Sequence, residues 1–143
     1  MTAAIVSTQR DAPGVTIELE VPFHDCDPLN IVWHGRYFDY MSHARTALMR
    51  SVQLDVPDVR GFGYRMYMTD VRCRYLFPLT YGDRVSVRAW FVRSEPTLRV
   101  GYTITNETHR RRAARGHTEI ATVDAAGHLL TRLPDAVRTR ISG

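Results

Sequence analysis

Apolar and polar residues alternate along several stretches of this 143-residue chain, and one stretch of helical spacing lies between them. Residues 15–21, VTIELEV, alternate with a period of two, which predicts a half-buried strand that Pro22 ends. Over residues 35–52, apolar side chains recur every three or four positions, which predicts a helix about 27 Å long. This apolar stripe consists of Tyr37, Tyr40, Met41, Ala44, Leu48 and Val52. The opposite side of the helix is predicted to face solvent and carries Asp39, His43, Arg45 and Arg50.

The second half of the chain predicts four further strands, over residues 64–76, 84–93, 98–108 and 116–123. In the first of them the alternation breaks near Asp70, which indicates a β-bulge. Proline and glycine predict a loop over residues 54–63, a solvated hairpin is expected over 110–115, and a short helix is expected to start at 133–135. One early strand, one long helix and four strands predict an α+β fold, with an antiparallel sheet packed on the helix.

Length and composition predict a single domain over residues 15–143, preceded by a flexible arm over residues 1–14. The chain has no apolar run of the roughly 20 residues that a membrane span needs, and its first residues lack the pattern of a signal peptide. We therefore expect a cytoplasmic location. Cys26 and Cys73 fall in a predicted loop and a predicted strand, and no disulfide is expected because cytosolic thiols are usually reduced.

All 19 basic residues are Arg, the chain has no Lys, and the formal net charge is +4. A positive surface suits a polyanionic ligand, because Arg guanidinium groups match phosphate geometry. Coenzyme A and nucleic acid are both polyanions of this kind. The densest basic run, residues 110–115, lacks the interleaved aromatic residues that stack on single strands, so we expect no nucleic-acid partner.

Candidate chemistry concentrates in residues 23–37, FHDCDPLNIVWHGRY. Asp25 and Asp27 stand two positions apart, and the Pro28 and Asn30 that follow exclude a regular helix, so both carboxylates are expected in a loop. Apolar residues 31–33 adjoin this loop. A carboxylate beside such an apolar wall is partly desolvated, which is one way in which proteins tune a base or a nucleophile.

Residues 25–37 resemble the signature of the 4-hydroxybenzoyl-CoA thioesterase family of hotdog-fold proteins, and the order of predicted elements over residues 15–133 is similar as well. The resemblance implies a hotdog fold, in which a curved antiparallel sheet wraps around one long central helix. It implies hydrolysis of an acyl-CoA or acyl-carrier-protein thioester to a free carboxylic acid, without a metal or a bound cofactor. It also implies a homodimer or a homotetramer, because chains of this family pair their sheets edge to edge.

Within the resemblance, Asp27 matches the catalytic carboxylate, which acts either as a nucleophile through an anhydride or as a general base. The main-chain N–H of His34 is the implied oxyanion donor, with the N-terminus of the helix behind it. The residues implied to line the substrate site are Asp25, Asn30, Ile31, Val32, Trp33, Arg36 and Tyr37. From the residue pattern itself, Asp25 is expected to cap its own loop, since an Asp before a turn often accepts hydrogen bonds from nearby backbone N–H groups.

Two positions depart from the family's pattern: Asn30 stands where the family most often has Gly, and Arg36 where it often has Asn. Both changes are expected to alter the lining of the acyl pocket while leaving the Asp27 loop in place. They keep a second function open, in which a non-catalytic hotdog module binds acyl thioesters.

Other chemistry is less favoured. Cys26 is expected to be a packing thiol, because only His24 is near enough in sequence to form a thiolate pair with it. The spacing of the His and Asp residues in the loop matches no compact metal motif. Phosphate contacts to CoA could come from residues 93–99 or from residues 110–115. The second run could also meet an acidic carrier protein, or simply face solvent.

Overall fold

The computed structural model describes residues 5–7 and 14–142. The strands are β1 (Ile5–Ser7), β2 (Gly14–Glu20), β3 (Arg65–Tyr75), β4 (Arg84–Arg93), β5 (Leu98–Asn106), β6 (Arg111–Val123) and β7 (Leu129–Leu130). The α-helices are α1 (Arg36–Ser51), α2 (Val56–Gly61) and α3 (Asp135–Ser142). A single 3₁₀ turn, η1 (Phe23–Asp25), precedes the loop that leads into α1.

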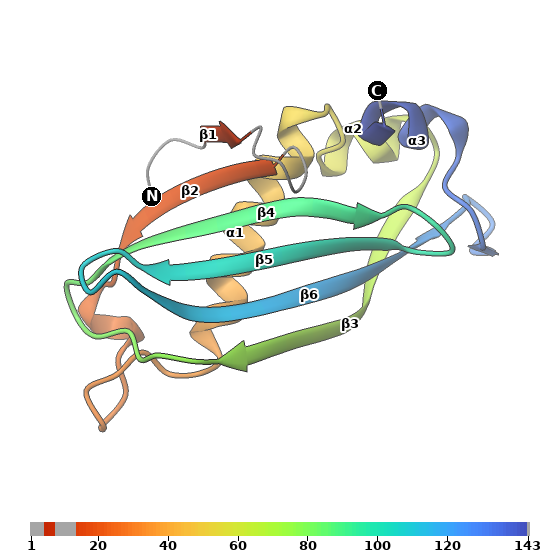
Figure 1. Cartoon of the computed structure of the whole chain (residues 1–143). Helices are drawn as coiled ribbons and strands as arrows, with labels where there is room; N and C mark the ends of the chain where they lie inside the picture. Colours follow the sequence, from red (N-terminus) through yellow and green to blue (C-terminus); the bar gives the residue numbers. More distant parts are fainter. Residues whose placement is uncertain (1–4, 8–13, 143) are drawn as a thin grey trace.

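The described strands form one antiparallel sheet in the order β1-β2-β4-β5-β6-β3, and β7 pairs with β6 outside this path. Figure 1 shows the long strands lying side by side across α1, with β3 at one edge of the sheet. The loop before α1, the end of β3 and the turn from β5 to β6 share one end of the molecule, and α2 and α3 lie at the other. This arrangement confirms the predicted α+β fold with a sheet packed on one helix.

The core lies between α1 and the inner face of the sheet, as the periodicities predicted. The helix buries Tyr37, Tyr40, Met41, Ala44 and Leu48. Strand β4 buries every second residue against this stripe, namely Val85, Val87 and Ala89. The single apolar face of each element is thereby removed from water, which is the main favourable contribution to folding.

Within residues 54–63, where the sequence predicted only a loop, Val56–Gly61 form the short helix α2, and that prediction is wrong. The carboxylate of Asp55 accepts a hydrogen bond from the Val56 N–H at 2.8 Å, and the carboxylate of Asp58 accepts one from the Asp55 N–H at 3.0 Å. The bond from the Asp55 N–H to the Asp58 carboxylate, together with a reciprocal bond from the Asp58 N–H to the Asp55 carboxylate, forms a capping box at the start of α2. Pro57 is tolerated because it stands in the first turn, where its missing N–H would have no helical acceptor.

The expected hairpin over residues 110–115 is also wrong in extent, because β6 already begins at Arg111. Ala113 and Ala114 are both fully buried, which breaks the alternation that marks a strand. The cause is a shift in the pairing between Ile104 and Thr105 of β5, which places two consecutive β6 residues toward the core. Only residues 107–110 form the turn.

The β-bulge expected near Asp70 is confirmed, since the pairing of β3 with β6 shifts between Met68 and Asp70. The predicted flexible arm falls mostly outside the described residues, and within it Ile5–Ser7 pair with β2. The described part of the chain contains no helix that is both long enough and apolar enough to cross a membrane.

Glu119 on β6 is a buried carboxylate that should stabilise the fold in a pH-dependent way. It accepts hydrogen bonds from Thr97, Arg99 and Arg93, the last at 2.7 Å. Burial alone would raise the pKa of Glu119, but these hydrogen bonds and the two Arg charges outweigh it and hold the pKa below its ordinary value. Its stabilisation is therefore complete above the ordinary pKa of Glu and is lost as the pH falls through the lowered pKa.

Glu119→Gln is accordingly expected to lower the free energy of unfolding at pH 7 by about 1–3 kcal/mol, because charge-assisted hydrogen bonds are lost. Urea unfolding followed by circular dichroism at several pH values would measure this difference. The gap between wild type and variant should close in acid, as the wild-type carboxylate becomes protonated. A gap that stays constant down to pH 3 would contradict the assignment.

Candidate active site

The loop with the two carboxylates is a small hairpin held by its own backbone. Cys26 and Val32 form an isolated antiparallel bridge. Between them the Asp27 N–H donates to the Ile31 carbonyl at 2.9 Å, and the Asn30 N–H donates to the Asp27 carbonyl at 2.9 Å. Asn30 has φ of +65°, a left-handed conformation that Asn adopts more readily than other residues with a side chain. The Asn at this position therefore preserves a turn that Gly would otherwise make.

Asp27 lines a hollow of about 370 Å³ at the start of α1. One carboxylate oxygen, Oδ1, accepts a hydrogen bond from the Leu29 N–H at 2.9 Å, which fixes the side chain within its turn. Within the described residues, Oδ2 has no hydrogen-bond partner. The other walls of the hollow come from the hairpin, from α1 and from the end of β3; they include Ile31, Val32, His34, Tyr37, Tyr75 and Phe77.

His34 stands in the turn that leads into α1, and its backbone is fixed from two sides. Its carbonyl accepts a hydrogen bond of 2.7 Å from the Tyr75 hydroxyl on β3. Gly35 follows directly under the ring of Trp33, where an added Cβ would lie 2.2 Å from a ring carbon, so a larger residue here would displace the Trp33 ring. In the described part of the chain the His34 N–H has no acceptor. It is therefore available as a donor beside the positive end of the helix dipole.

Two tyrosines form the inner wall of this hollow. The rings of Tyr37 and Tyr75 meet edge to face with their centroids 4.8 Å apart. Burial, with a smaller effect of Cys73, raises the pKa of each hydroxyl to about 12. Both hydroxyls therefore stay protonated at neutral pH, and Tyr75 remains a donor to His34.

Asp25 does not cap its own loop, and that prediction is corrected by its contacts. Its buried carboxylate accepts a hydrogen bond of 2.7 Å from the hydroxyl of Tyr40 on α1. Arg36 Nε lies 3.4 Å and His24 Nε2 lies 3.3 Å from Oδ1. Asp27, by contrast, makes the loop cap that was expected of Asp25. Asp25 thus joins the loop to α1, and it lines a separate hollow of about 340 Å³ together with Arg36.

The residues singled out from the sequence are therefore distributed over two hollows. Asp27, Ile31, Val32, His34 and Tyr37 lie around one, and Asp25 and Arg36 lie around the other. Asn30 forms the turn and is exposed, while the half-exposed Trp33 packs on Gly35. Sequence reasoning missed Tyr75 and Phe77 as site residues. Their only signal was their position at the end of a predicted strand, which does not reveal what that end faces.

Cys26 is free, and its surroundings oppose a nucleophilic role. Burial, with smaller effects of Asp25 and Asp27, raises the pKa of the Cys26 thiol above its ordinary value. A thiol in this state is protonated at neutral pH and reacts slowly. The described residues contain no group of three or more His, Cys, Asp and Glu side chains placed to hold a metal ion.

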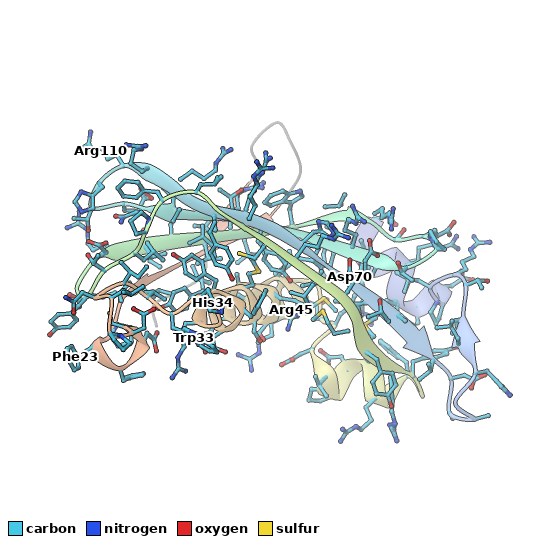
Figure 2. The ribbon with its side chains drawn as sticks, turned by 90° about the horizontal axis from the view of Figure 1, so that it is seen from below. Phe23, Trp33, His34, Arg45, Asp70 and Arg110 are labelled. Atoms are coloured by element: carbon cyan, nitrogen blue, oxygen red, sulfur yellow. The ribbon has the colours of Figure 1, made fainter. Side chains whose placement is uncertain are left out.

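The Arg-rich start of β6 lies at the same end of the molecule as this hollow. The Arg111 guanidinium stacks on the ring of Phe77, with its central carbon 4.7 Å from the ring centroid. Figure 2 shows Arg110 at the same end as His34 and Trp33. Arg93 and Arg99, the other candidates for phosphate contacts, are paired with the buried carboxylate of Glu119.

Two curated relatives align with half of the chain. Over 73 residues, 51% of this chain, it is 32% identical to YneP of Bacillus subtilis, a candidate acyl-CoA thioesterase. Over a segment of the same length it is 26% identical to the chloroplastic acyl-acyl carrier protein thioesterase ATL3 of Arabidopsis thaliana. The aligned segment spans 53% of YneP and 38% of ATL3, so the chain matches about half or less of these relatives.

Solved structures and a family match cover far more of the chain. Slr0204, a 1,4-dihydroxy-2-naphthoyl-CoA thioesterase from Synechocystis, superimposes with a TM-score of 0.80 at 19% identity, covering 90% of this chain and 96% of its own. SAV2348 from Staphylococcus aureus, solved in complex with CoA, gives a TM-score of 0.80 at 18% identity and covers 89% and 80%. These likenesses confirm the hotdog fold. Residues 21–141 match the sequence model of the thioesterase-like superfamily, and the chain therefore belongs to that superfamily.

Proposed function

We propose that this protein hydrolyses acyl-CoA thioesters, with Asp27 as the catalytic carboxylate. The observation that carries the proposal is the place of Asp27 in a hollow at the start of α1, with Oδ2 free within the described residues and with His34 lining the same hollow. The resemblance of residues 25–37 to the 4-hydroxybenzoyl-CoA thioesterase family supports the same residue. The CoA bound to SAV2348 supports CoA as the carrier, and an acyl carrier protein is the alternative carrier.

Hydrolysis adds water across the C–S bond: the water oxygen joins the acyl carbon, and the sulfur leaves as a free thiol with a proton. Asp27 takes the proton from this water as a general base, or attacks the acyl carbon itself to form an anhydride that water then opens. In both routes negative charge develops on the carbonyl oxygen. The His34 N–H, at the positive end of α1, is the donor that would stabilise this charge.

A panel of short, long and aromatic acyl-CoAs, with one acyl-carrier-protein thioester, tests this proposal. Release of the free thiol would be followed with a thiol reagent, and hydrolysis of at least one member supports it. If one member binds by calorimetry but none is hydrolysed, the protein is the binding module that the sequence left open.

We also propose that the protein is at least a homodimer joined through β3. This strand is 11 residues long and stands at the edge of the sheet among the described strands. It exposes a row of large apolar side chains, namely Tyr67, Met68, Val71 and Tyr75. A long edge strand with unpaired backbone groups and exposed apolar side chains is a template for pairing with another strand, and a second copy of β3 would cover it.

The Arg-rich start of β6 is proposed to attract the CoA phosphates, because Arg111 adjoins the Asp27 hollow through Phe77. Arg111→Glu is expected to raise KM for acyl-CoA by about 2- to 5-fold, since exposed charges contribute little each. The salt dependence of KM should also weaken, because such charges are screened over about 8 Å at physiological ionic strength. Steady-state kinetics at several salt concentrations would measure both effects.

The matched control is Arg132→Glu, which makes the same change of charge at a residue that is paired with Glu95, outside this hollow. If both variants raise KM equally, the effect comes from net charge and Arg111 holds no phosphate. If neither does, the start of β6 is only a solvated surface.

A further inference from the structure

A third and larger cavity, of about 620 Å³, lies between the middle of α1, helix α2 and the first half of β3. Its volume is within the range of small-molecule sites. Most of its lining is apolar and includes Met49, Leu54, Val59, Met66, Met68 and Ile120. None of the residues discussed for hydrolysis lines this cavity. It has the walls of a site for a hydrocarbon chain.

Arg45 lies in this cavity, although the helical pattern predicted it on the solvated side of α1. It is only partly exposed. Its Nη1 donates to the Tyr102 hydroxyl at 3.1 Å, and its Nη2 donates to Ser42 Oγ at 3.3 Å. The Tyr102 hydroxyl in turn lies 2.9 Å from Thr118 Oγ1, and both of these residues are fully buried. Figure 2 shows Arg45 beside β3.

The charge of Arg45 has no counter-ion in the described structure. Its partners are neutral hydroxyls, and no carboxylate of the described residues lies within ion-pair distance of it. The one acid that lines the cavity, Asp55, is engaged by Arg50 at 2.8 Å and caps α2. The remaining charged lining residues are Arg60 and Arg65. A half-buried guanidinium that is held by neutral hydroxyls in a largely apolar, net positive cavity is suited to receive an anion, because no carboxylate of the described residues balances its charge.

The proposed dimer connects this cavity with the Asp27 hollow. Two copies of one strand that pair about a twofold axis run antiparallel, so the first half of one lies opposite the second half of the other. Met66 and Met68 in the first half of β3 line the Arg45 cavity, and Tyr75 at its end lines the Asp27 hollow. Pairing therefore brings the Arg45 cavity of one copy next to the Asp27 hollow of its partner. This step rests on the proposed function and assembly.

We infer that the Arg45 cavity takes the acyl chain and that Arg45 binds a carboxylate at the far end of that chain. The preferred substrates are then CoA monothioesters of dicarboxylic acids. Their methylene groups contact the Met and Leu walls, and their terminal carboxylate accepts hydrogen bonds from the guanidinium fork. The reacting carbonyl lies at the other end of the chain, toward Asp27 of the partner.

Adipoyl-CoA and hexanoyl-CoA test this inference, because they share chain length and differ in the terminal carboxylate. Wild type is expected to show the higher kcat/KM with adipoyl-CoA. In Arg45→Gln the ratio of the two kcat/KM values should fall by about 10- to 100-fold, since hydrogen bonds to charged groups are lost. Arg45→Lys keeps the charge but lacks the guanidinium fork, so its ratio of kcat/KM values should lie between those of wild type and Arg45→Gln. The control Arg132→Gln removes a positive charge outside the cavity and should keep the wild-type ratio.

Several outcomes would overturn the inference. A wild-type enzyme with a higher kcat/KM for hexanoyl-CoA would overturn it. A folded Arg45→Gln variant that loses kcat/KM equally for both substrates would also overturn it. In the second case, if Arg45→Gln lowers kcat/KM for acyl-CoA but not for acyl-pantetheine, the ligand of Arg45 is a CoA phosphate.

Binding separates this inference from the proposed hydrolysis. Calorimetry would give the Kd of adipoyl-CoA and of hexanoyl-CoA for the Asp27→Asn variant and for the double variant Asp27→Asn, Arg45→Gln. This measurement does not require that the protein be an enzyme. Tighter binding of adipoyl-CoA that depends on Arg45 supports the inference even if wild type hydrolyses nothing. Equal binding of the two thioesters overturns it even if hydrolysis is found.

Discussion

Asp27→Asn is expected to lower kcat for the best acyl-CoA by about 10²–10⁴-fold if Asp27 acts as a general base, and by more if it is the nucleophile. The amide keeps the size of the side chain and can still accept the hydrogen bond from the Leu29 N–H, so the turn should survive. What is lost is the basic and nucleophilic oxygen. Rapid mixing with thiol detection would measure kcat, and circular dichroism would confirm that the variant is folded.

Asp25→Asn is the matched control for this variant, because it makes the same chemical change two residues away. Its buried carboxylate accepts from Tyr40 and lies beside Arg36, so the free energy of unfolding should fall by about 1–3 kcal/mol. The effect on kcat should be much smaller than that of Asp27→Asn. Wild-type kcat in Asp27→Asn would remove Asp27 from the reaction, and a larger loss in Asp25→Asn would transfer the catalytic role to Asp25.

Val71→Asp is expected to separate the proposed dimer into monomers and to lower kcat/KM by at least about 10²-fold. Val71 is 39% exposed near the middle of the edge strand β3, so antiparallel pairing would place the two copies of this residue close together. Two added carboxylates would then repel each other where apolar side chains should meet. Activity should fall as well, because in the proposed composite site the Arg45 cavity of one copy and the Asp27 hollow of its partner act together.

Light scattering at micromolar concentration, together with kinetics on the same sample, would test this expectation. Leu129→Asp is the control: it replaces an apolar residue that is 63% exposed on β7, away from the β3 edge. A wild-type monomer that is fully active would contradict the proposed assembly and the composite site together. A monomeric Val71→Asp that keeps wild-type kcat/KM would contradict the composite site alone.

Much of the secondary structure follows from the sequence because its causes are local. Period-two alternation predicted β4 at its observed bounds, and the break in alternation near Asp70 predicted the bulge in β3. The apolar stripe predicted α1 to within one residue at each end. The missed helix α2 also had a local signal, the Asp55 and Asp58 capping box, which the nearby Pro57 obscured.

Contacts between distant segments could not be predicted, because they depend on how the strands and α1 are placed against one another. Asp25 meets Tyr40 15 residues away, Tyr75 reaches the carbonyl of His34 across 41 residues, and Arg45 reaches Tyr102 across 57. Periodicity alone placed Arg45 among solvated residues. It states which side of a helix a residue occupies, and it does not state what the neighbouring elements cover.

By itself, the sequence determined the order of α1 and the long strands, the loop that carries Asp25 and Asp27, and the resemblance that singled out Asp27, since each of these depends on residues close together in the chain. Only the tertiary structure decided that Asp25 is tied to α1 while Asp27 lines an open hollow with Tyr75. It alone placed Arg45 in a largely apolar cavity without a counter-ion among the described residues. The physical reason is that burial and charge pairing arise from residues distant in sequence, and packing brings them together only when the chain folds.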